Sequence, residues 1–327
     1  MTITNAWALG VDIGGTKTLA TLVDNSGVAA EVCEEPTPAA GGPDAVLDGA
    51  IDLARRALNA LPGGAEAVAA IGVGAAGVID AATGTVLSAT SSLPGWSGTD
   101  IRCAFQDAFP GLNVVVVNDV QAFTWAETVH GSAFGRSIVL GVMVGTGIGG
   151  GLVVGGRLVD GAHSAAGHLG HVTVASAAGL RCPCGRSGHL EAVASGPAMT
   201  DAYRRAGGDA RDLRAVAAAA TSGDPIARVI LDAGADAVGI AIGSVANMID
   251  PDTVVIGGGV TGLGDGWLDR VRVAAAGTAV PALGLLQIDV GTLGATAVAI
   301  GAAELARAES AGTKFAAMAS GPVNGSR

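Results

Sequence analysis

Aromatic residues are scarce in this chain: Phe, Trp and Tyr together make up only 3% of its 327 residues. Apolar residues as a whole reach 50%, so the hydrophobic cores must be built from Ala, Val, Leu and Ile. Glycine is abundant, with 53 residues, and it permits backbone angles and close ligand approaches that other residues do not. The length leaves room for two domains, each with its own core.

Positive charge is also in short supply, because 18 Lys and Arg face 29 Asp and Glu and leave a net charge of −11. This balance disfavours binding to nucleic acid or to an anionic membrane surface. It does not exclude an anionic substrate, since a local glycine-rich pocket can offset the global field. No Lys or Arg precedes Lys17, which argues against a secretory signal peptide. We therefore expect a cytoplasmic protein.

Cysteine is rare as well, and two of the four cysteines lie in one short cluster, which favours a reducing cytosol over a disulfide framework. The charge-free run of residues 137–156 could span a bilayer by its length alone. Eight of these twenty residues are Gly, which makes a poor helix. We predict a strand, a tight turn and a second strand there.

Two segments, 9–27 and 140–156, repeat one pattern: an apolar strand, a Gly-Thr-rich turn, a second strand and a glycine turn. The repeat predicts two similar lobes with the glycine-rich turns facing each other across a cleft. Elsewhere predicted strands alternate with helices, including helices at 43–61 and 234–249. This alternation predicts an α/β fold with largely parallel central pairing.

The first glycine turn, residues 10–17 (GVDIGGTK), has the composition of a phosphate site. Gly14 and Gly15 let backbone N–H groups approach phosphate oxygens, and the Thr16 hydroxyl can add a donor. Asp12 could hold Mg²⁺, directly or through water, as phosphoryl transfer requires. An ordinary hairpin turn is the alternative.

The second turn, residues 145–150 (GTGIGG), formally matches the dinucleotide fingerprint G-x-G-x-x-G. That fingerprint needs a following helix and an acid about 20 residues further on. A strand follows here and no acid stands at the required distance, so we reject a nicotinamide-dependent dehydrogenase and predict a second phosphate turn. Met143 stands where Asp12 stands in the first copy, so only the first lobe keeps the acid.

A buried strand, VVVV, ends in Asn118 and Asp119, at the edge where α/β sheets present ligand-binding groups. A carboxylate there could take a proton from a substrate hydroxyl as it attacks the γ-phosphorus. A turn or helix-capping Asp is the alternative. The glycines of 256–260 (IGGGV) could let an adenine or ribose lie against bare backbone, or could be a packing cluster.

Four side chains supply nitrogen or sulfur ligands for a closed tetrahedral zinc site: His171, Cys182, Cys184 and His189. The alternative is a pair of buried thiols with solvent-facing histidines. A saturated site has no open position, so the metal would brace a loop and take no part in the chemistry. His168 and Glu191 flank this site and are left to meet a ligand.

In their order along the chain these motifs resemble the ROK family of sugar kinases and related repressors, within the actin, hexokinase and Hsp70 ATPase superfamily. The matching motifs, from about Leu9 to about residue 300, are DIGGTK, LPGW, ND, GTGIGGG, GHLGH, CPCGRSGHLE and IGGG. The resemblance implies an α/β fold of two ribonuclease H-like lobes around a central cleft. It also implies ATP-dependent phosphorylation of a hexose, most often at the 6-hydroxyl of glucose.

The resemblance further implies a small lobe, 1–119, completed by a C-terminal helix at about 294–312. The large lobe would be 120–293 with a zinc-binding loop at 163–191, and the tail 313–327 is expected to be disordered. The implied partners are a hexose or N-acylhexosamine and ATP with Mg²⁺, beside structural Zn²⁺ and further copies of the chain in a homodimer or homotetramer.

The family's residue roles can be carried over to matching positions. Asp119 would be the general base, Asn118 a sugar partner and Asp12 the Mg²⁺ site. His171 would both ligate zinc and reach the sugar, and Glu191 would also bind sugar. The phosphates and adenosine would be lined by Gly14, Gly15, Thr16, Lys17, Gly145, Thr146, Gly147, Gly258 and Gly259.

Two positions depart from the family pattern. The family usually reads G-E-x-G-H, so His168 replaces a sugar-binding carboxylate and offers one donor and one acceptor instead of acceptors alone. His189 replaces the last of three zinc cysteines, a change that zinc accepts. The sugar, glucose or N-acetylmannosamine, and the donor, ATP or polyphosphate, stay open.

Two other functions within the family compete with the kinase. A repressor would carry a winged-helix segment before the first phosphate motif, whereas Asp12 lies near the start of this sequence. A non-catalytic sugar sensor, or a regulator without a DNA-binding domain, would be expected to lose the carboxylate base, whereas Asp119 is present. We therefore predict a sugar kinase.

Overall fold

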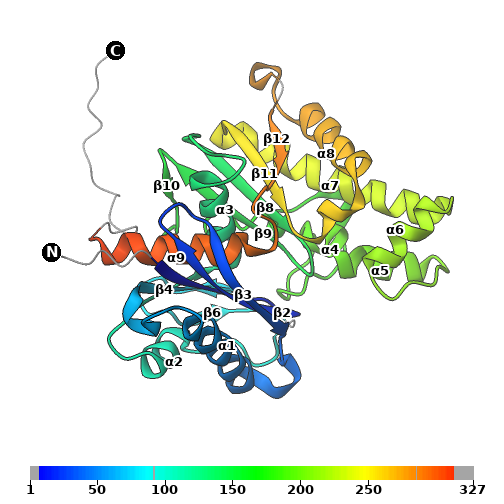
Figure 1. Ribbon diagram of the computed structural model, residues 1–327. Helices are drawn as coiled ribbons and strands as arrows, with labels where there is room; N and C mark the ends of the chain where they lie inside the picture. Colours follow the sequence, from blue (N-terminus) through cyan, green and yellow to red (C-terminus); the bar gives the residue numbers. More distant parts are fainter. Residues whose placement is uncertain (1–6, 91–92, 285, 313–327) are drawn as a thin grey trace, which may run out of the picture.

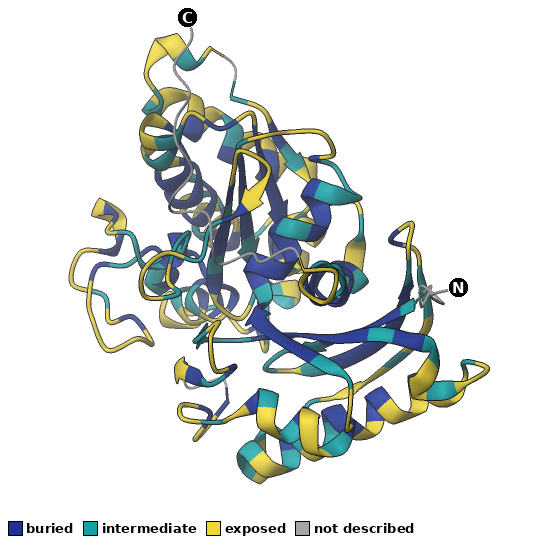
Figure 2. Ribbon diagram, turned by 90° about the vertical axis from the view of Figure 1, so that its left-hand side faces the viewer, coloured by how far each residue is buried: buried dark blue, intermediate teal, exposed yellow. Residues whose placement is uncertain are grey.

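The computed structural model describes residues 7–90, 93–284 and 286–312. Two five-stranded sheets with flanking helices form the two halves of the molecule (Figure 1). The burial pattern in Figure 2 shows that most of the buried residues lie in these sheets and in the helices packed on them. The tail that we expected to be disordered, 313–327, lies outside the described residues.

The first sheet has the strand order β3-β2-β1-β4-β7. Strands β1, β2 and β3 pair antiparallel, whereas β1, β4 and β7 pair parallel. The bounds are β1 (Trp7–Ile13), β2 (Lys17–Asp24), β3 (Ala29–Pro36), β4 (Val68–Ala75) and β7 (Asn113–Asn118). Helix α1 (Gly42–Asn59) packs on β1, β2 and β3, and α2 (Ile101–Ala108) packs on β7. A small hairpin, β5 (Val78–Ile79) and β6 (Val86–Ser88), follows β4.

The second sheet repeats this arrangement with the order β10-β9-β8-β11-β12. Its first three strands pair antiparallel and its last three pair parallel. The bounds are β8 (Val139–Val144), β9 (Ile148–Val154), β10 (Arg157–Leu158), β11 (Thr253–Gly257) and β12 (Ile288–Val290). The repeat predicted from 9–27 and 140–156 is therefore confirmed, as is the strand-turn-strand reading of 137–156.

Helices of the second half pack beside its sheet. They are α4 (Glu191–Ala194), α5 (Gly196–Arg205), α6 (Leu213–Thr221), α7 (Pro225–Ile249) and α8 (Asp265–Thr278). Helix α7 begins nine residues before the predicted 234–249, because Asp224 caps it by accepting from the backbone N–H groups of Ile226 and Ala227.

Helix α7 is the one helix in the described part of the chain that is long and apolar enough to cross a membrane. Length and composition are weak evidence on their own, since a core helix passes the same test. Of its most apolar window, 56% is buried, and the helix packs along α8. Small residues on α7, Gly239 and Gly243, allow that close packing. We therefore interpret α7 as a core helix of the second half.

Two helices lie between the sheets, α3 (Asp119–Val129) and α9 (Ala297–Ser310), and they pack against each other. Helix α9 lies on β1 and β4, where a side chain at Gly10 or Gly72 would overlap its backbone. Helix α3 lies on β8 and β9, where a side chain at Gly141 or Gly151 would overlap Thr124. Glycines in the strands thus allow one helix to pack closely on each sheet.

Candidate active site

A cleft of about 440 Å³ opens between the two halves, and both glycine turns line it. Almost every residue singled out from the sequence borders this space. They are Asp12, Gly14, Gly15, Thr16, Lys17, Asn118, Asp119, Gly145, Thr146, Gly147, His168, His171, Cys184, Glu191, Gly258 and Gly259. Cys182 and His189 do not border it.

The first glycine turn connects β1 to β2 and is held from one side by Thr37. The Thr37 hydroxyl donates to the carbonyl of Gly14 at 2.7 Å, and its N–H donates to the carbonyl of Thr16 at 3.1 Å. Lys17 follows the turn, and its ammonium group lies 2.7 Å from the carboxylate of Glu34. Lys17 thus borders the cleft with a carboxylate partner, which a bound phosphate would have to displace.

The second glycine turn connects β8 to β9 and is held by hydrogen bonds to Glu191 and Gly196, which follow the zinc-ligand segment, residues 171–189, in the sequence. The N–H of Gly196 donates to the carbonyl of Gly145 at 2.8 Å. The N–H of Ile148 donates to the carboxylate of Glu191 at 2.7 Å. A Cβ at position 147 would lie 2.7 Å from the same carboxylate oxygen, so Gly147 is needed for this approach.

The third glycine-rich segment follows β11 and lies against the second turn. Gly258 has φ of 88° and ψ of −176°, a combination that is essentially restricted to glycine. A Cβ there would lie 2.5 Å from the carbonyl oxygen of Val144. At Gly259 a Cβ would meet nothing within 4 Å. Gly258 and Gly259 therefore border the cleft with backbone atoms alone, and Gly258 does so in a conformation that other residues rarely adopt.

Asn118 and Asp119 lie where β7 passes into α3. Asn118 is only 5% exposed and caps the helix, because its side-chain oxygen accepts from the N–H groups of Val120 and Gln121 at 3.0 and 3.1 Å. Its amide nitrogen donates to the carbonyl of Gly77 at 2.8 Å and to Asp119 Oδ1 at 2.9 Å. With its carbonyl and both amide hydrogens engaged, Asn118 is a positioning residue for Asp119, and its sugar contact stays a prediction.

The Asp119 carboxylate is oriented by two donors on the same oxygen. Oδ1 accepts from Asn118 and from the N–H of Val120, each at 2.9 Å, which leaves Oδ2 for a substrate hydroxyl. Burial raises the pKa of Asp119 to about 6, and these hydrogen bonds oppose the rise. The group is therefore ionised at neutral pH yet basic enough to take up a proton.

Asp12 lies at the end of β1 beside the first glycine turn. Burial raises its pKa to about 8, the charge of Asp119 adds to the rise, and Lys17 opposes it. Two carboxylates in one buried cleft repel each other, and a divalent cation would relieve that repulsion. The oxygen ligands suit Mg²⁺, so the site fits this ion.

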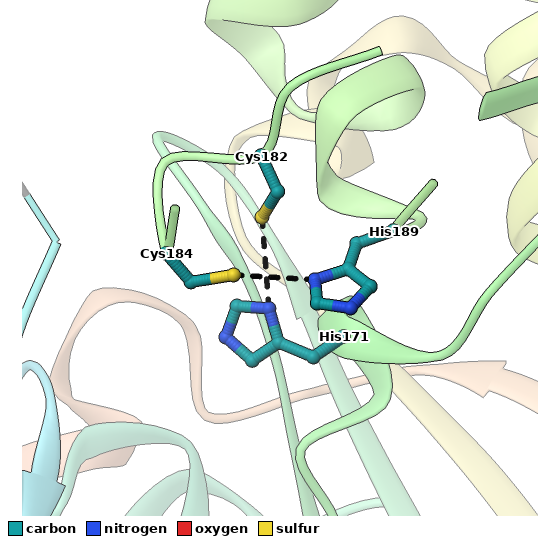
Figure 3. Close-up of side chains that lie close together, drawn as sticks. All are labelled: His171, Cys182, Cys184 and His189. Atoms are coloured by element: carbon teal, nitrogen blue, oxygen red, sulfur yellow. Dashed lines mark hydrogen bonds between the residues drawn. The ribbon is translucent and has the colours of Figure 1, made fainter. Parts of the chain in front are cut away.

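The four proposed zinc ligands converge on one point, with all ligand atoms within 4.8 Å of one another (Figure 3). His171 Nδ1 lies 3.7 Å from Cys182 Sγ, and His189 Nδ1 lies 3.2 Å from Cys184 Sγ. Tetrahedral zinc with its usual bond lengths separates nitrogen and sulfur ligands by about 3.5 Å. The donor set and its spacing fit zinc.

His168 borders the cleft beside this cluster. Its ring is stacked on that of His171, with centroids 6.2 Å apart. Burial lowers the pKa of both histidines, so both are neutral at pH 7. Glu191 is 4% exposed, and burial raises the pKa of its carboxyl group. Its bond to Ile148 means that the carboxylate already serves the second turn, and its sugar contact stays a prediction.

Sequence reasoning missed one wall of the cleft, which is formed by residues 76–78 and 88–90 around the small hairpin. No motif marks these residues. The LPGW motif does lie nearby, but Trp96 is only 1% exposed and Leu93 only 3% exposed. Both pack in the hydrophobic core of the first half. Trp96 supports the wall by donating from its indole N–H to the carbonyl of Ala76 at 3.1 Å.

Comparison with known proteins agrees with this geometry. The sequence model of the ROK family matches residues 8–309.

This chain belongs to the ROK family.

An N-acetylmannosamine kinase of Salmonella paratyphi A is 38% identical over 81% of this chain and 86% of its own length. A ROK hexokinase from Thermus thermophilus has a TM-score of 0.79 and 33% identity, covering 93% of this chain and 98% of its own. A ROK glucokinase from Streptomyces griseus, in complex with glucose and AMPPNP, has a TM-score of 0.80 and 31% identity, covering 92% and 99%. These similarities confirm the predicted actin, hexokinase and Hsp70 type of fold.

Proposed function

We propose that this ROK protein is an ATP-dependent hexose kinase whose main reaction is phosphorylation of glucose at the 6-hydroxyl. One observation carries the proposal: a single cleft holds a buried, oriented carboxylate, Asp119, together with two glycine turns from opposite halves of the molecule. Membership of a family with named sugar kinases on both the sequence and the structural side supports it.

In the proposed reaction Asp119 accepts the proton of the sugar hydroxyl through Oδ2. The hydroxyl oxygen bonds to the γ-phosphorus while the bond from that phosphorus to the β,γ-bridging oxygen breaks, so ADP leaves with the electron pair. The pKa of about 6 keeps Asp119 ionised before the reaction and able to hold the proton after it. Asn118 keeps Oδ1 occupied and the carboxylate in one orientation.

We assign the phosphates to the backbone N–H groups and hydroxyls of the two glycine turns. The first turn offers Gly14, Gly15, Thr16 and Lys17, and the second offers Gly145, Thr146 and Gly147. Gly258 and Gly259 would lie against the adenosine. Asp12 would hold Mg²⁺, which neutralises charge on the β- and γ-phosphates when bound.

We assign zinc to His171, Cys182, Cys184 and His189. All four positions of a tetrahedral ion would be filled by the protein, so the ion supplies rigidity to the loop. That loop brings His168 and His171 to the border of the cleft and ends at Glu191, the first residue of α4. The metal would therefore act on the sugar site only through the side chains it orders.

N-acetylmannosamine is the second candidate sugar, favoured by the Salmonella relative and by His168. A neutral imidazole can donate a hydrogen bond to an acyl oxygen, which a carboxylate cannot do. A non-catalytic sugar sensor is the alternative of another class. Polyphosphate is the alternative phosphoryl donor.

We further propose that the small lobe comprises 1–119 with the C-terminal helix and that the large lobe comprises 120–293. The packing of α9 on β1 and β4, and of α3 on β8 and β9, supports this division. A cytoplasmic location and a homodimer or homotetramer complete the proposal.

The decisive experiment is a phosphorylation assay with ATP and Mg²⁺ over glucose, mannose, fructose, allose, N-acetylglucosamine and N-acetylmannosamine. Asp119→Asn is the control, because the amide keeps the shape and cannot take up the proton. Turnover of one sugar that drops by about 10²- to 10⁴-fold in the control supports the proposal. Sugar binding without turnover, with ATP and then with polyphosphate, would favour the sensor.

A further inference from the structure

The chain passes between the two halves at two points within the described residues. The first is at Asn118 and Asp119, where β7 of the first sheet leads into α3, which lies on the second sheet. The second is at 291–296, where β12 of the second sheet leads into α9, which lies on the first sheet. Any rotation of one half against the other must be absorbed near these two crossings.

A buried carboxylate on α3 holds the second crossing. Glu127 is 0% exposed and lies in the last turns of α3. Its Oε2 accepts from the N–H of Thr292 at 3.1 Å, and its Oε1 accepts from the N–H of Leu293 at 2.9 Å. Oε2 also accepts from the N–H and hydroxyl of Ser132, at 2.8 and 3.1 Å, in the turn after α3.

The surroundings of Glu127 are shaped for this carboxylate. Each bonded segment has a glycine just before the residue that donates, Gly131 before Ser132 and Gly291 before Thr292. A Cβ at position 291 would lie 2.7 Å from Oε1, and one at position 131 would overlap Oε2. The groups that face the carboxylate are donors, which an acceptor-only side chain satisfies and an amide does not.

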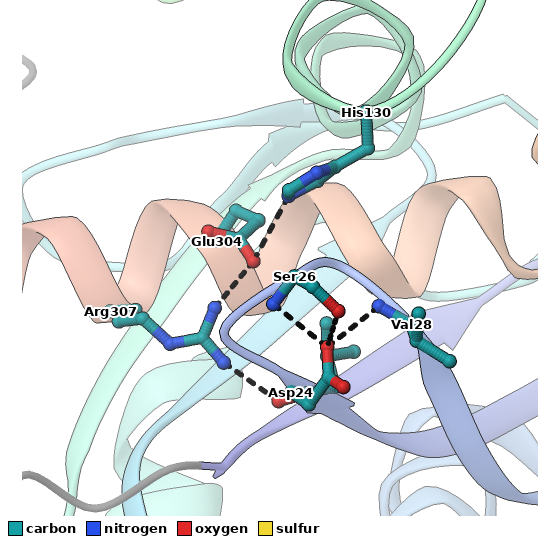
Figure 4. Close-up of polar contacts among 7 residues, drawn as sticks. Asp24, Ser26, Val28, His130, Glu304 and Arg307 are labelled. Carbon is teal, nitrogen blue, oxygen red and sulfur yellow. Dashed lines mark hydrogen bonds and ion pairs between the residues drawn. The ribbon is translucent and has the colours of Figure 1, made fainter.

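A second set of contacts joins the same end of α3 to α9 and the first sheet (Figure 4). His130 caps α3, and its Nε2 lies 3.3 Å from the carboxylate of Glu304 on α9. Glu304 also pairs with Arg307, whose guanidinium donates to the carbonyl of Val23 at 2.7 Å. The ring of His130 lies against Gly27 in the β2–β3 turn. The C-terminal end of α3 is thus bound to both halves.

We propose that Glu127 is a positioning residue that pins the second crossing to the end of α3 and thereby sets the hinge axis of the cleft. The first crossing lies at the N-terminus of α3 and the second is pinned at its C-terminus. The 11 residues of α3 span about 16 Å, so the axis runs along this helix.

The location of the axis has a consequence for the chemistry. Points on a hinge axis keep their positions relative to both bodies while the bodies rotate. Asp119 lies at one end of the axis, so the base keeps its position relative to both glycine turns while the turns approach each other. Glu127 would therefore influence turnover from the far end of α3 without touching substrate. This inference rests on the proposed kinase function.

The test compares Glu127→Gln with Glu309→Gln, a matched change at an exposed position on α9. The amide would place its NH₂ group against backbone donors and release one of the two bonds to the crossing. We expect kcat to fall by about 10- to 100-fold with a smaller change in the KM for sugar. Small-angle scattering with sugar and AMPPNP should show weaker compaction than in the wild type, and Glu309→Gln should match the wild type in both.

Hydrogen exchange on ligand-free protein gives a readout that does not depend on activity. The amides of Thr292 and Leu293 should be protected in the wild type, and at least one should exchange faster in Glu127→Gln. If that variant does not fold, hydrogen exchange on the wild type still tests the inference. Both amides must then stay protected with and without ligands, because hydrogen bonds at a hinge axis do not break when the two halves rotate. Rapid exchange there, or normal kcat and compaction in a folded variant, would overturn the inference. A wild type that phosphorylates no sugar would instead overturn the proposed function and leave the exchange result standing.

Discussion

The carboxylate of Glu191 accepts a 2.7 Å hydrogen bond from the N–H of Ile148 and so joins the metal-ligand loop to the second glycine turn. Glu191 follows His189 by two residues and opens α4. Ile148 opens β9, directly after Gly147. A disturbance of the loop would therefore be transmitted to the proposed phosphate site as well as to the sugar site.

Loss of the metal should therefore weaken ATP binding as well as sugar binding. We expect Cys184→Ser to lower the zinc content from about one per chain and to raise the KM for both substrates roughly tenfold. His163→Ala is the control, because His163 is an exposed histidine of the same loop outside the cluster. Elemental analysis and initial rates are the measurements. A zinc-free protein with unchanged kinetics would show that the metal does not support either substrate site.

The pH dependence of turnover should report Asp119. Because burial raises its pKa to about 6, the base is protonated and inactive below that pH and ionised above it. The acid limb of kcat/KM should therefore lie near pH 6, well above the 3.8 of an ordinary Asp. Rates from pH 4.5 to 8.5 would measure it. A limb below pH 5, or one that persists in Asp119→Asn, would assign the limb to another group.

The buried charge of Asp12 should cost stability when no cation is present. Its pKa is raised from 3.8 to about 8, so the folded protein binds the proton more tightly than the unfolded chain does. The free energy of unfolding therefore falls as pH rises between these two values. Asp12→Asn should raise the Tm relative to wild type in EDTA at pH 8 more than at pH 5.5. Mg²⁺ with nucleotide should stabilise the wild type more than the variant; an equal effect would contradict the Mg²⁺ assignment.

Two neighbouring glycines offer a matched pair for the nucleotide site. Gly258→Ala forces a side chain into a glycine-only conformation and toward Val144, at a cost of about 1–3 kcal/mol in stability. The displaced backbone should raise the KM for ATP more than that for sugar. Gly259→Ala meets open space and should leave stability and the KM for sugar near wild type. Thermal unfolding and initial rates check both, and a tolerated Gly258→Ala would show that this segment can shift freely.

Sugar selectivity should respond to His168. We expect His168→Glu to restore an acceptor-only group and to shift the ratio of kcat/KM for N-acetylmannosamine over glucose downward, by about tenfold. The comparison requires both sugars on both proteins under one set of conditions. An unchanged ratio would place His168 outside the sugar contact.

The fold was largely predictable because hydrophobic alternation and glycine turns are local features. The repeat of 9–27 at 140–156 predicted two similar halves, and the structure shows two sheets with the same strand order. The glycine turns that line the cleft and the cluster of four metal-type side chains were predictable for the same reason, since their residues lie close together in the sequence. Their binding of phosphate and zinc stays a prediction. The start of α7 was missed because the cap at Asp224 precedes the apolar pattern that marked the helix.

The sequence by itself determined which chemical groups this protein has: the glycine turns, a carboxylate after a buried strand and a cluster of metal-type ligands. Only the tertiary structure decided how they are used. It makes Asn118 the N-cap of α3, and it hydrogen-bonds the Glu191 carboxylate to the N–H of Ile148. It also brings the Glu127 carboxylate to the backbone of Thr292, 165 residues away. The physical reason is that a hydrogen bond depends on position in space, and α3 and α9 bring together segments that no sequence spacing connects.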